Sequence, residues 1–498
     1  MKRRIVLTSL AIFAPLGVAN ATGFVTSRFG GEMGHPTTDS PTAIYYNPAA
    51  LTQGKGMRLY LDGTFAWIKA SHDRPEEAIY PVLAENQAGE GTPASAVDRN
   101  SGKAELFNVA AAPFIGFTSS LPIDGLTVAL ALYAPFGGAS KWDRNDTFKN
   151  DAAYPGAYDG PQRWWSIEGS LRSVYITGAA AYRLESLGLS FGLGLNLVKS
   201  EIKTLRARNA NGGDALVTQD DSGGTVLQEG RSMIDVAGTD LSAGLGVLWE
   251  PNDAWAVGLS YQSQPGFGEM ELEGKLKFVL GGRGAAQTET VKVHQELPDI
   301  IRLGGRHRPS KSLELRLFGE LDRWSVFDRQ CLVVKGKDRS DCPLDGDGNP
   351  NLESDGMGGT APASTAHIIQ NVQRNWQDAV AVRAGASYWL DNGVELVGGL
   401  GYDGNAVPDE QLDPAIPDFH DVSLALGGKV KLLDDALAVA GTYTQIIYFS
   451  REIAPLERDA AGVPITTYAA GSPSLQPDAA GKYERAIGVF NLNVEYTF

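Results

Sequence analysis

Few residues in this sequence stand in a pattern that catalysis requires. The chain has six histidines, at His35, His72, His294, His307, His367 and His420. None of them lies in a G-x-S-x-G nucleophile elbow or in an H-E-x-x-H zinc motif. Because catalytic triads assemble from positions far apart in sequence, this makes an enzyme less favoured and leaves it open as an alternative. We expect no catalytic residues, no metal site and no cofactor.

The two cysteines, Cys331 and Cys342, are the only ones in the chain. They lack the C-x-x-C spacing of a redox pair and the partner ligands of a metal site. In an oxidising compartment a lone pair this close in sequence most simply forms one disulfide that closes a loop. We therefore predict a structural disulfide between Cys331 and Cys342.

An acidic run, Asp345-Gly346-Asp347-Gly348-Asn349, places carboxylates at alternate positions, as calcium loops do. An EF-hand loop would require glycine where Pro350 stands and a bidentate glutamate where Gly356 stands. The sequence therefore indicates a solvated acidic turn.

The N-terminus carries an export signal. Lys2, Arg3 and Arg4 precede an apolar run over 5–18, which ends at Ala19-Asn20-Ala21. This is the form of a secretory signal peptide with an A-x-A cleavage site, and the apolar run is too short to anchor the chain in a membrane. We predict a signal peptide over residues 1–21 and a mature chain that starts at Thr22.

The composition is acidic, with 59 Asp+Glu against 43 Lys+Arg and a formal net charge of −16. Binding to nucleic acid requires cationic surface, so nucleic acid is not an expected partner. No segment after the signal has the roughly eighteen unbroken apolar residues of a transmembrane helix.

Strands with two-residue alternation dominate the rest of the chain. Over 187–198 the odd positions are Leu or Phe and the even positions are Gly, Ser or Asn, and 422–432 alternates in the same way. In a membrane barrel the apolar face of each strand meets lipid, and the face with small or polar side chains lines the lumen. The last strand ends at Phe498, and a terminal aromatic residue is the form of the outer-membrane assembly signal. We therefore expect the barrel-assembly machinery, outer-membrane lipid and lipopolysaccharide as partners.

We predict about 14 antiparallel strands, joined alternately by short turns and long polar loops. This sorting is typical of outer-membrane barrels, with short turns on the periplasmic side and long loops outside. The long loops are expected at about 71–102, 138–162, 205–230, 278–287, 327–374, 406–417 and 451–481. The predicted strands are 56–70, 103–118, 124–137, 163–183, 187–204, 231–250, 254–277, 288–308, 312–326, 375–390, 393–405, 418–432, 435–450 and 482–498.

The stretch over 23–51 shows neither strand nor helix periodicity and is rich in Gly, Thr, Ser and Pro. Its place between the export signal and the first strand predicts a plug folded into the lumen. The expected organisation is a signal peptide at 1–21, a hatch at 22–55 and a barrel at 56–498, in a monomer.

Short motifs spread over the mature chain support this organisation. In chain order they are Gly23-Phe24, Tyr46-Asn47-Pro48-Ala49, Leu297-Pro298-Asp299, Asn375-Trp376-Gln377-Asp378-Ala379, Tyr402-Asp403 and Tyr496-Thr497-Phe498. Together they resemble the FadL/TodX-type family of outer-membrane transporters for long-chain fatty acids and aromatic hydrocarbons. The resemblance implies a fourteen-stranded barrel whose hatch carries the motif Asn47, Pro48 and Ala49. It also implies that a hydrophobic ligand is captured in an internal pocket and leaves sideways through the wall.

The same resemblance implies ligand contacts. Arg206 matches one member of a basic pair that meets a fatty-acid carboxylate, whereas the second position falls at the uncharged Gln377. That departure leaves room for a neutral hydrocarbon, and Arg206 can instead be a rim arginine facing water or lipopolysaccharide phosphate. Phe24 is expected either to reach into the pocket or to anchor the plug.

An aromatic cluster includes Trp142, Trp164 and Trp165. It indicates either an interfacial girdle, which is the commoner case, or a ligand-catching mouth.

Three other functions remain as alternatives: a general aqueous porin, an outer-membrane enzyme such as a lipase, and an adhesin acting through its acidic loops.

If residues 22–51 plug the lumen, their deletion will turn a nearly closed barrel into an open conductor. The measurement is single-channel conductance in planar bilayers, with the full mature chain as reference. Equal conductance in the two proteins would mean that this segment is no plug.

Overall fold

The computed structural model describes residues 25–26, 28–84, 87–209, 212–220, 222–279, 281, 285–337, 342–345, 348–354, 356–466, 468 and 472–498. The predicted signal peptide and Phe24 lie outside the described residues. No helix within the described part of the chain is both long and apolar enough to cross a membrane.

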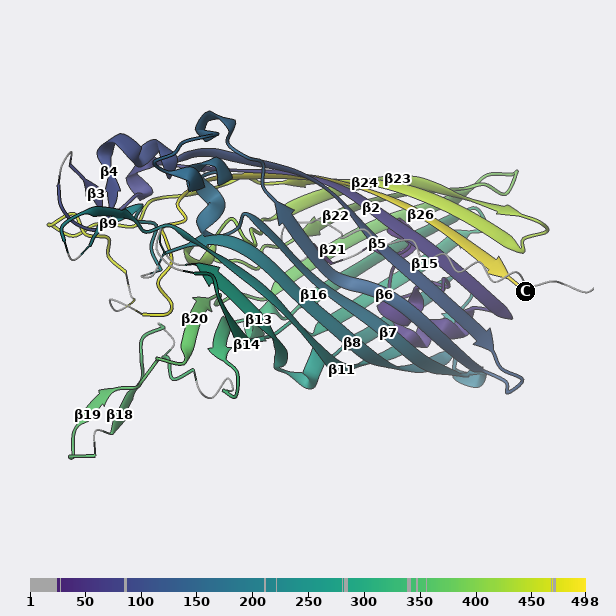
Figure 1. The fold of residues 1–498 in the computed structure, drawn as a ribbon. Coiled ribbons are helices and arrows are strands. Elements are labelled where there is room, and N and C mark those ends of the chain that lie inside the picture. The colour runs from purple at the N-terminus through teal and green to yellow at the C-terminus, as the bar shows by residue number, and fades with distance from the viewer. Residues whose placement is uncertain are drawn as a thin grey trace, which may run out of the picture.

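Fourteen antiparallel strands form a closed barrel, which confirms the predicted fold class (Figure 1). The first strand pairs along its length with the last, and this pairing closes the ring. Ten of the fourteen are continuous: β2 Met57–Arg74, β5 Gly102–Ser120, β6 Leu126–Lys141, β7 Glu168–Leu184, β8 Leu189–Arg208, β11 Gly230–Asn252, β22 Glu395–Asp403, β23 Asp421–Leu432, β24 Leu437–Tyr448 and β26 Gly481–Thr497.

The other four strands are each broken into two segments. The pairs of segments are β12 Trp255–Gln262 with β13 Met270–Val279, β14 Gln287–Gln295 with β15 Ile300–Ser310, β16 Leu313–Asp322 with β17 Arg329–Val334, and β20 Ile368–Gln373 with β21 Ala379–Trp389. The predicted strand 312–326 therefore ended too early and 375–390 began too late. Both errors have one cause: the wall continues beyond each break as β17 and β20, which the sequence pattern assigned to the long loop 327–374.

The connections alternate as predicted. Short turns at 121–125, 185–188, 253–254, 311–312, 390–394 and 433–436 lie at one end, and the long loops lie at the other. The hairpin of β18 (Leu352–Ser354) and β19 (Thr360–Pro362) projects from the long-loop end (Figure 1). The other loop strands are β3 Val82–Leu83, β4 Thr92–Pro93, β9 Val217–Gln219, β10 Thr225–Leu227 and β25 Arg451–Ile453.

Short helical turns occupy the connections and breaks. They are η3 Glu76–Ala78, η4 Ala94–Arg99, η5 Asp146–Phe148, η6 Pro155–Asp159, η7 Pro161–Trp164, η8 Glu185–Leu187, η9 Pro265–Phe267, η10 Trp324–Val326 and η12 Asp409–Gln411.

The outer face of the barrel is apolar where it meets lipid. On β8, Leu193, Leu195 and Leu197 are 47%, 61% and 46% exposed, whereas Ser190 and Asn196 on the lumen face are buried. A second sheet packed on this face, as in a soluble sandwich, would have covered these leucines. Their exposure is that of a lipid-facing surface.

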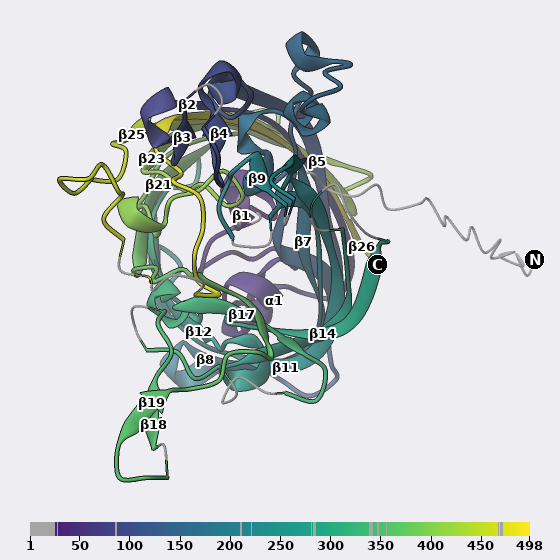
Figure 2. The ribbon, with the colours of Figure 1, turned by 60° about the vertical axis from the view of Figure 1, so that its left-hand side comes forward.

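The hatch, residues 28–54, lies inside the ring of strands at the short-turn end (Figures 1 and 2). It contains η1 Gly31–Met33, α1 Ala43–Tyr46 and η2 Pro48–Gln53, and the two-residue strand β1 Val25–Thr26 precedes it. The Asn47 side chain caps η2, because its Oδ1 accepts from the Ala49 N–H (3.1 Å). Its Nδ2 donates to the carbonyls of Val247 on β11 (3.0 Å) and Pro36 (2.9 Å). One side chain thus joins the hatch to the wall.

Glycines on three neighbouring strands make room for this contact. A Cβ added at Gly192 on β8 would lie 2.2 Å from the Ala49 nitrogen, and one at Gly246 on β11 would lie 2.0 Å from Asn47 Oδ1. At Gly258 on β12 it would lie 2.4 Å from the Pro36 carbonyl oxygen. Since real Cβ atoms do not approach this closely, only glycine allows the hatch backbone to reach the wall here.

Charged side chains hold the hatch at two further places on the wall, one on β15 beside β12 and one on β22 and β23. Arg302 on β15 is fully buried, pairs with Glu320, donates to the Tyr45 hydroxyl (2.8 Å) and lies over the Tyr45 ring. Arg28 of the hatch donates to Asp403 on β22 (2.9 Å) and to Ser423 on β23 (3.1 Å). The hatch is therefore tied to both halves of the barrel.

Substituting Gly246→Val will dislodge the hatch, since the new side chain overlaps Asn47. We expect a folded barrel with raised bilayer conductance and faster protease cleavage within residues 28–54. Gly178→Ala on the lipid-facing side of β7 is the matched control, because a Cβ there meets nothing within 4 Å. Heat-modifiable migration in SDS gels checks that both variants are folded, and a closed Gly246→Val barrel would contradict the expected fit.

Candidate functional site

An apolar cavity lies inside the long-loop half of the barrel. Side chains from six strands and one loop make its apolar wall: Leu171, Ile202, Ile234, Val293, Leu332, Val372 and Ile416. Ligand pockets are typically lined in this way, mostly by apolar side chains with a few placed polar groups. We call this space the inner cavity.

Polar side chains gather at one part of the inner cavity. They are Arg206, Gln330, Gln370, Arg374, Asp413 and Gln476. The two arginines differ in their hydrogen-bond and ion-pair partners.

Arg206, the arginine singled out by the family resemblance, lies in the wall of the inner cavity near the end of β8. Its guanidinium donates to Gln476 Oε1 (3.2 Å) and to Gln370 Oε1. None of the ion pairs between described residues includes Arg206. A cation held only by neutral amide oxygens in a mainly apolar cavity attracts an anionic group.

Arg374 supplies a second arginine to the same wall, but its charge is already compensated. It pairs with Asp413 (2.9 Å), and its Nε and one terminal nitrogen donate to Gln330 Oε1 (3.0 and 2.7 Å). The family resemblance implies a second basic position at Gln377 instead. The break at 374–378 disrupts the alternation of this strand, and sequence reasoning therefore missed Arg374.

Gln377 lies outside the inner cavity. Its side chain is exposed, and Nε2 donates to the Asn405 carbonyl (3.4 Å). A ligand-binding role for Gln377 stays a prediction that its position does not support.

Aromatic side chains separate the inner cavity from the hatch. Trp324 and Trp376, from two strand breaks, lie 4.9 Å apart between ring centroids, and Phe327 lies 4.9 Å from Trp376. Phe136 on β6 lies 6.4 Å from Trp324. The strand breaks at 323–328 and 374–378 thus turn Trp324 and Trp376 inward. In unbroken strands, successive side chains would alternate between the lumen and the outer face.

The barrel wall has an interruption beside the inner cavity. The pairing of β5 with β6 runs from Ser120 opposite Thr127 to Phe114 opposite Tyr133 and stops there. Just beyond, at 134–135, the pairing of β6 with β7 shifts register, and Pro135 has no N–H to donate. The two segments meet again where the Asp143 N–H donates to the Glu105 carbonyl (2.9 Å). Between these points, residues 106–113 have no ladder partner on this side among the described residues. We call this interruption the window.

The N-terminal strand β1 occupies part of the window. Val25 pairs with Gly137 and Thr26 with Phe136, on the edge of β6 that β5 has left. Gly138 and Ser140, just beyond this pairing, line the inner cavity. The segment that enters the hatch therefore lies between the cavity and the gap in the wall.

The three tryptophans considered as an interfacial girdle are buried. Trp142, Trp164 and Trp165 are 4%, 2% and 5% exposed, and Trp165 lines the inner cavity. Buried ion pairs fix the loops around them: Arg163 with Glu229 (3.0 Å) and Arg74 with Asp214 (2.6 Å). The loops form a packed lid in which these tryptophans are core residues.

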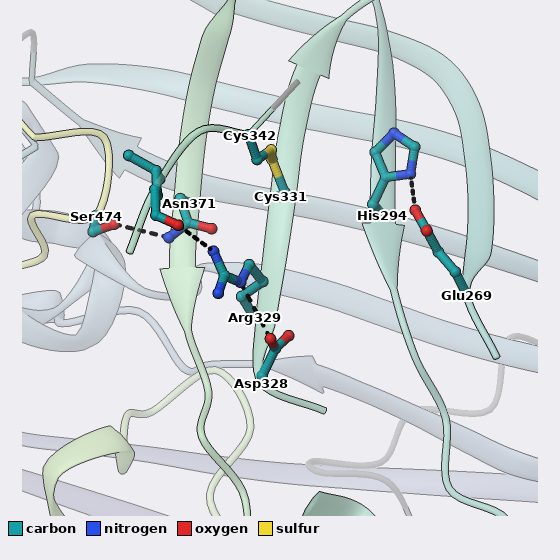
Figure 3. The surroundings of a disulfide bond; sticks show 9 residues. Glu269, His294, Asp328, Arg329, Cys331, Cys342, Asn371 and Ser474 are labelled. Atoms are coloured by element: carbon teal, nitrogen blue, oxygen red, sulfur yellow. Dashed lines mark hydrogen bonds and ion pairs between the residues drawn. A yellow bond between two sulfur atoms is a disulfide. The ribbon is translucent and has the colours of Figure 1, made fainter. Parts of the chain in front are cut away.

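Cys331 on β17 and Cys342 are joined by a disulfide in the structure (Figure 3). Cys331 lies opposite Asn371 of β20, whose side-chain nitrogen donates to Ser474 Oγ (2.8 Å). On the other side of β17, His294 of β14 contacts Glu269. Within the described residues, no group of three or more His, Cys, Asp or Glu side chains is placed to hold a metal ion.

A family model described as "Outer membrane protein transport protein (OMPP1/FadL/TodX)" matches residues 17–498. A putative outer membrane protein of Neisseria meningitidis serogroup B is 22% identical over 439 residues, covering 81% of this chain and 80% of that protein.

Two solved structures share the fold. The crystal structure of a Pseudomonas aeruginosa FadL homologue has a TM-score of 0.71 at 16% identity, covering 96% of this chain and 100% of that chain. The Ralstonia pickettii toluene transporter TbuX has a TM-score of 0.57 at 14% identity, covering 96% and 99%.

Acid will loosen the lid through Glu229. Burial raises the pKa of this carboxyl, but its ion pairs with Arg163 and Arg231 outweigh burial and hold the pKa below its ordinary value. The stabilisation is therefore complete above the ordinary glutamate pKa of about 4.3 and is lost as pH falls through the lower folded-state pKa. We expect protease cleavage of the long loops to increase in that range.

Glu229→Gln will lose this pH dependence, and Glu77→Gln, which changes an exposed glutamate of the same lid, will keep it. Identical cleavage profiles for wild type and Glu229→Gln across this pH range would contradict the role given to the ion pair.

Proposed function

The chain belongs to the OMPP1/FadL/TodX family of outer membrane transport proteins, and from that membership we propose that it takes up long-chain fatty acids passively. The family transports hydrophobic substrates across the outer membrane. The choice of an acid rests on one observation: Arg206 is a cavity-lining cation with no carboxylate partner among the described residues.

The apolar wall of the inner cavity and Arg206 would bind different parts of a fatty acid. A hydrocarbon chain gains about 25 cal/mol for each Å² of apolar surface removed from water, and Leu171, Ile202 and Val293 belong to the wall that would cover it. A carboxylate that meets the Arg206 fork forms charge-assisted hydrogen bonds, about twice as strong as those between neutral groups. An amphiphilic acid satisfies both parts of the site.

We infer a route that avoids an aqueous pore. The hatch and the aromatic layer of Trp324, Phe327 and Trp376 stand below the inner cavity, so a straight path to the periplasm is filled with side chains. The window between β5 and β6 opens beside the cavity toward lipid, and the short strand β1 lies across part of it. Movement of β1 would let an apolar chain pass sideways without entering water.

Uptake of a neutral aromatic hydrocarbon is the second candidate. Two observations favour it: Arg374 is already neutralised by Asp413, and the aromatic Trp165 belongs to the lining of the inner cavity. A general porin is disfavoured because the hatch occupies the lumen, and an adhesin would have no use for the inner cavity. The outer-membrane lipid, lipopolysaccharide and assembly machinery remain proposed partners of a monomeric barrel.

Arg206→Met will weaken fatty-acid binding about ten- to a hundredfold, the effect of losing charge-assisted hydrogen bonds worth about 1.5–3 kcal/mol. Arg206→Lys will retain part of the affinity. The measurements are uptake of a labelled long-chain fatty acid by cells and mass spectrometry of ligands that co-purify in detergent.

Arg172→Met, on the outward face of β7, is the control for loss of an arginine outside the cavity. Co-purifying aromatic hydrocarbons, with unchanged fatty-acid uptake in Arg206→Met, would favour the second candidate. A reproducibly empty, ion-conducting protein would instead favour a porin.

A further inference from the structure

A second cavity lies between the inner cavity and the long loops. Loop residues such as Gly212, Ala366 and Pro473 line it, and we call it the outer cavity. Among the described residues, just three line both cavities: Arg206, Gln370 and Gln476. These three side chains are therefore the partition between the two spaces.

The partition is a closed ring of hydrogen bonds. Arg206 donates to the side-chain oxygens of both glutamines, and Gln370 Nε2 donates to Gln476 Oε1 (3.4 Å). The three residues come from β8, β20 and the last long loop, which meet only through tertiary folding. In this ring the Arg206 cation holds the side chains of two neutral glutamines between the inner and the outer cavity. We call the place where they lie the passage.

The backbone around the ring is fixed, whereas the ring itself consists of side chains. The carbonyl of Ile369 accepts from Arg208 (2.9 Å), and the Asn371 N–H donates to the Pro473 carbonyl (2.9 Å). The Asn371 side chain also donates to Ser474, and β17 beside β20 carries the disulfide (Figure 3). The passage can thus open by rotation of the two glutamine side chains alone.

We propose that Gln370 and Gln476 are a latch that a carboxylate releases from Arg206. This rests on the proposed function and adds the residues that select the substrate class. An ionised carboxylate binds a guanidinium more strongly than neutral amide oxygens do, so an acid that reaches the outer cavity displaces both glutamines and opens the passage. A neutral molecule of the same shape has nothing to exchange for the latch and stays outside.

The test compares two probes, a fluorescent long-chain fatty acid and its methyl ester, on the detergent-purified mature chain. Wild type should bind the acid at least about tenfold faster than the ester, in line with the strength of a charge-assisted hydrogen bond. The double variant Gln370→Ala/Gln476→Ala removes the latch and should admit the ester as fast as the acid. Gln370→Glu supplies a permanent carboxylate to Arg206 and should slow the acid by a similar factor.

Gln287→Glu, an exposed position at the edge of β14, is the matched control for the added charge. Heat-modifiable migration verifies that every variant is folded. Equal rates for acid and ester in wild type, or an unchanged acid rate in Gln370→Glu, would overturn the latch while fatty-acid binding by wild type still supported the proposed function. Failure of wild type to bind either probe would overturn the proposed function and, with it, the latch.

Discussion

Backbone pairing in lipid is the constraint on which this structure depends. Each backbone group in the hydrocarbon layer must find a partner within the protein, so a β-sheet is stable there only when it closes into a ring. Pairing of β2 with β26 closes the ring, but β5 and β6 separate beside the inner cavity. β1 supplies partners to the exposed edge of β6 at that place. The hatch and the window are therefore coupled. Movement of β1, which leads into the hatch, changes whether the edge of β6 is paired.

A second constraint concerns the charged arginine side chains inside the protein. A buried guanidinium is expensive unless a carboxylate and further hydrogen bonds compensate it. Arg302 with Glu320, Arg163 with Glu229 and Arg74 with Asp214 meet this requirement. Arg206 has two amide oxygens in the same role, which are weaker acceptors than a carboxylate. These three arginines have carboxylate partners, whereas Arg206 is left with neutral partners and so keeps its capacity to bind an anionic ligand.

Sequence reasoning predicted the parts of the fold that depend on periodicity. The number of strands, the order of short and long connections and the plug in the lumen all follow from alternation, turn residues and the unpatterned stretch after the signal. The strand breaks did not follow, because Leu297, Trp324 and Trp376 are apolar and fit a strand pattern as well as they fit an inward bulge. β17 and β20 lie beyond these breaks, at the two ends of the stretch 327–374, whose polar character predicts a long loop.

The candidate site was predictable only in part. Arg206 was found through the family resemblance, whereas Arg374 lies beside a break that sequence alone did not show. Gln370 and Gln476 belong to segments that resemble ordinary polar loops, and 106 residues separate them. Their meeting at Arg206 depends on the register of β20 against β17 and on the anchoring of the last loop by Asn371. No local pattern encodes that meeting.

Rigidity of the lid and mobility of single side chains are complementary in such a transporter. A lid that opened by loop unfolding would expose the inner cavity to water and lose the contrast in polarity that draws an apolar chain inward. Buried ion pairs at Arg163 and Arg74, together with the disulfide, keep the loops packed, so access must depend on smaller movements. Side-chain rotation is fast on the scale of ligand binding, whereas local unfolding is slow. A fixed lid with a passage closed by side chains therefore allows selection of the ligand at the passage, before the lateral step through the wall.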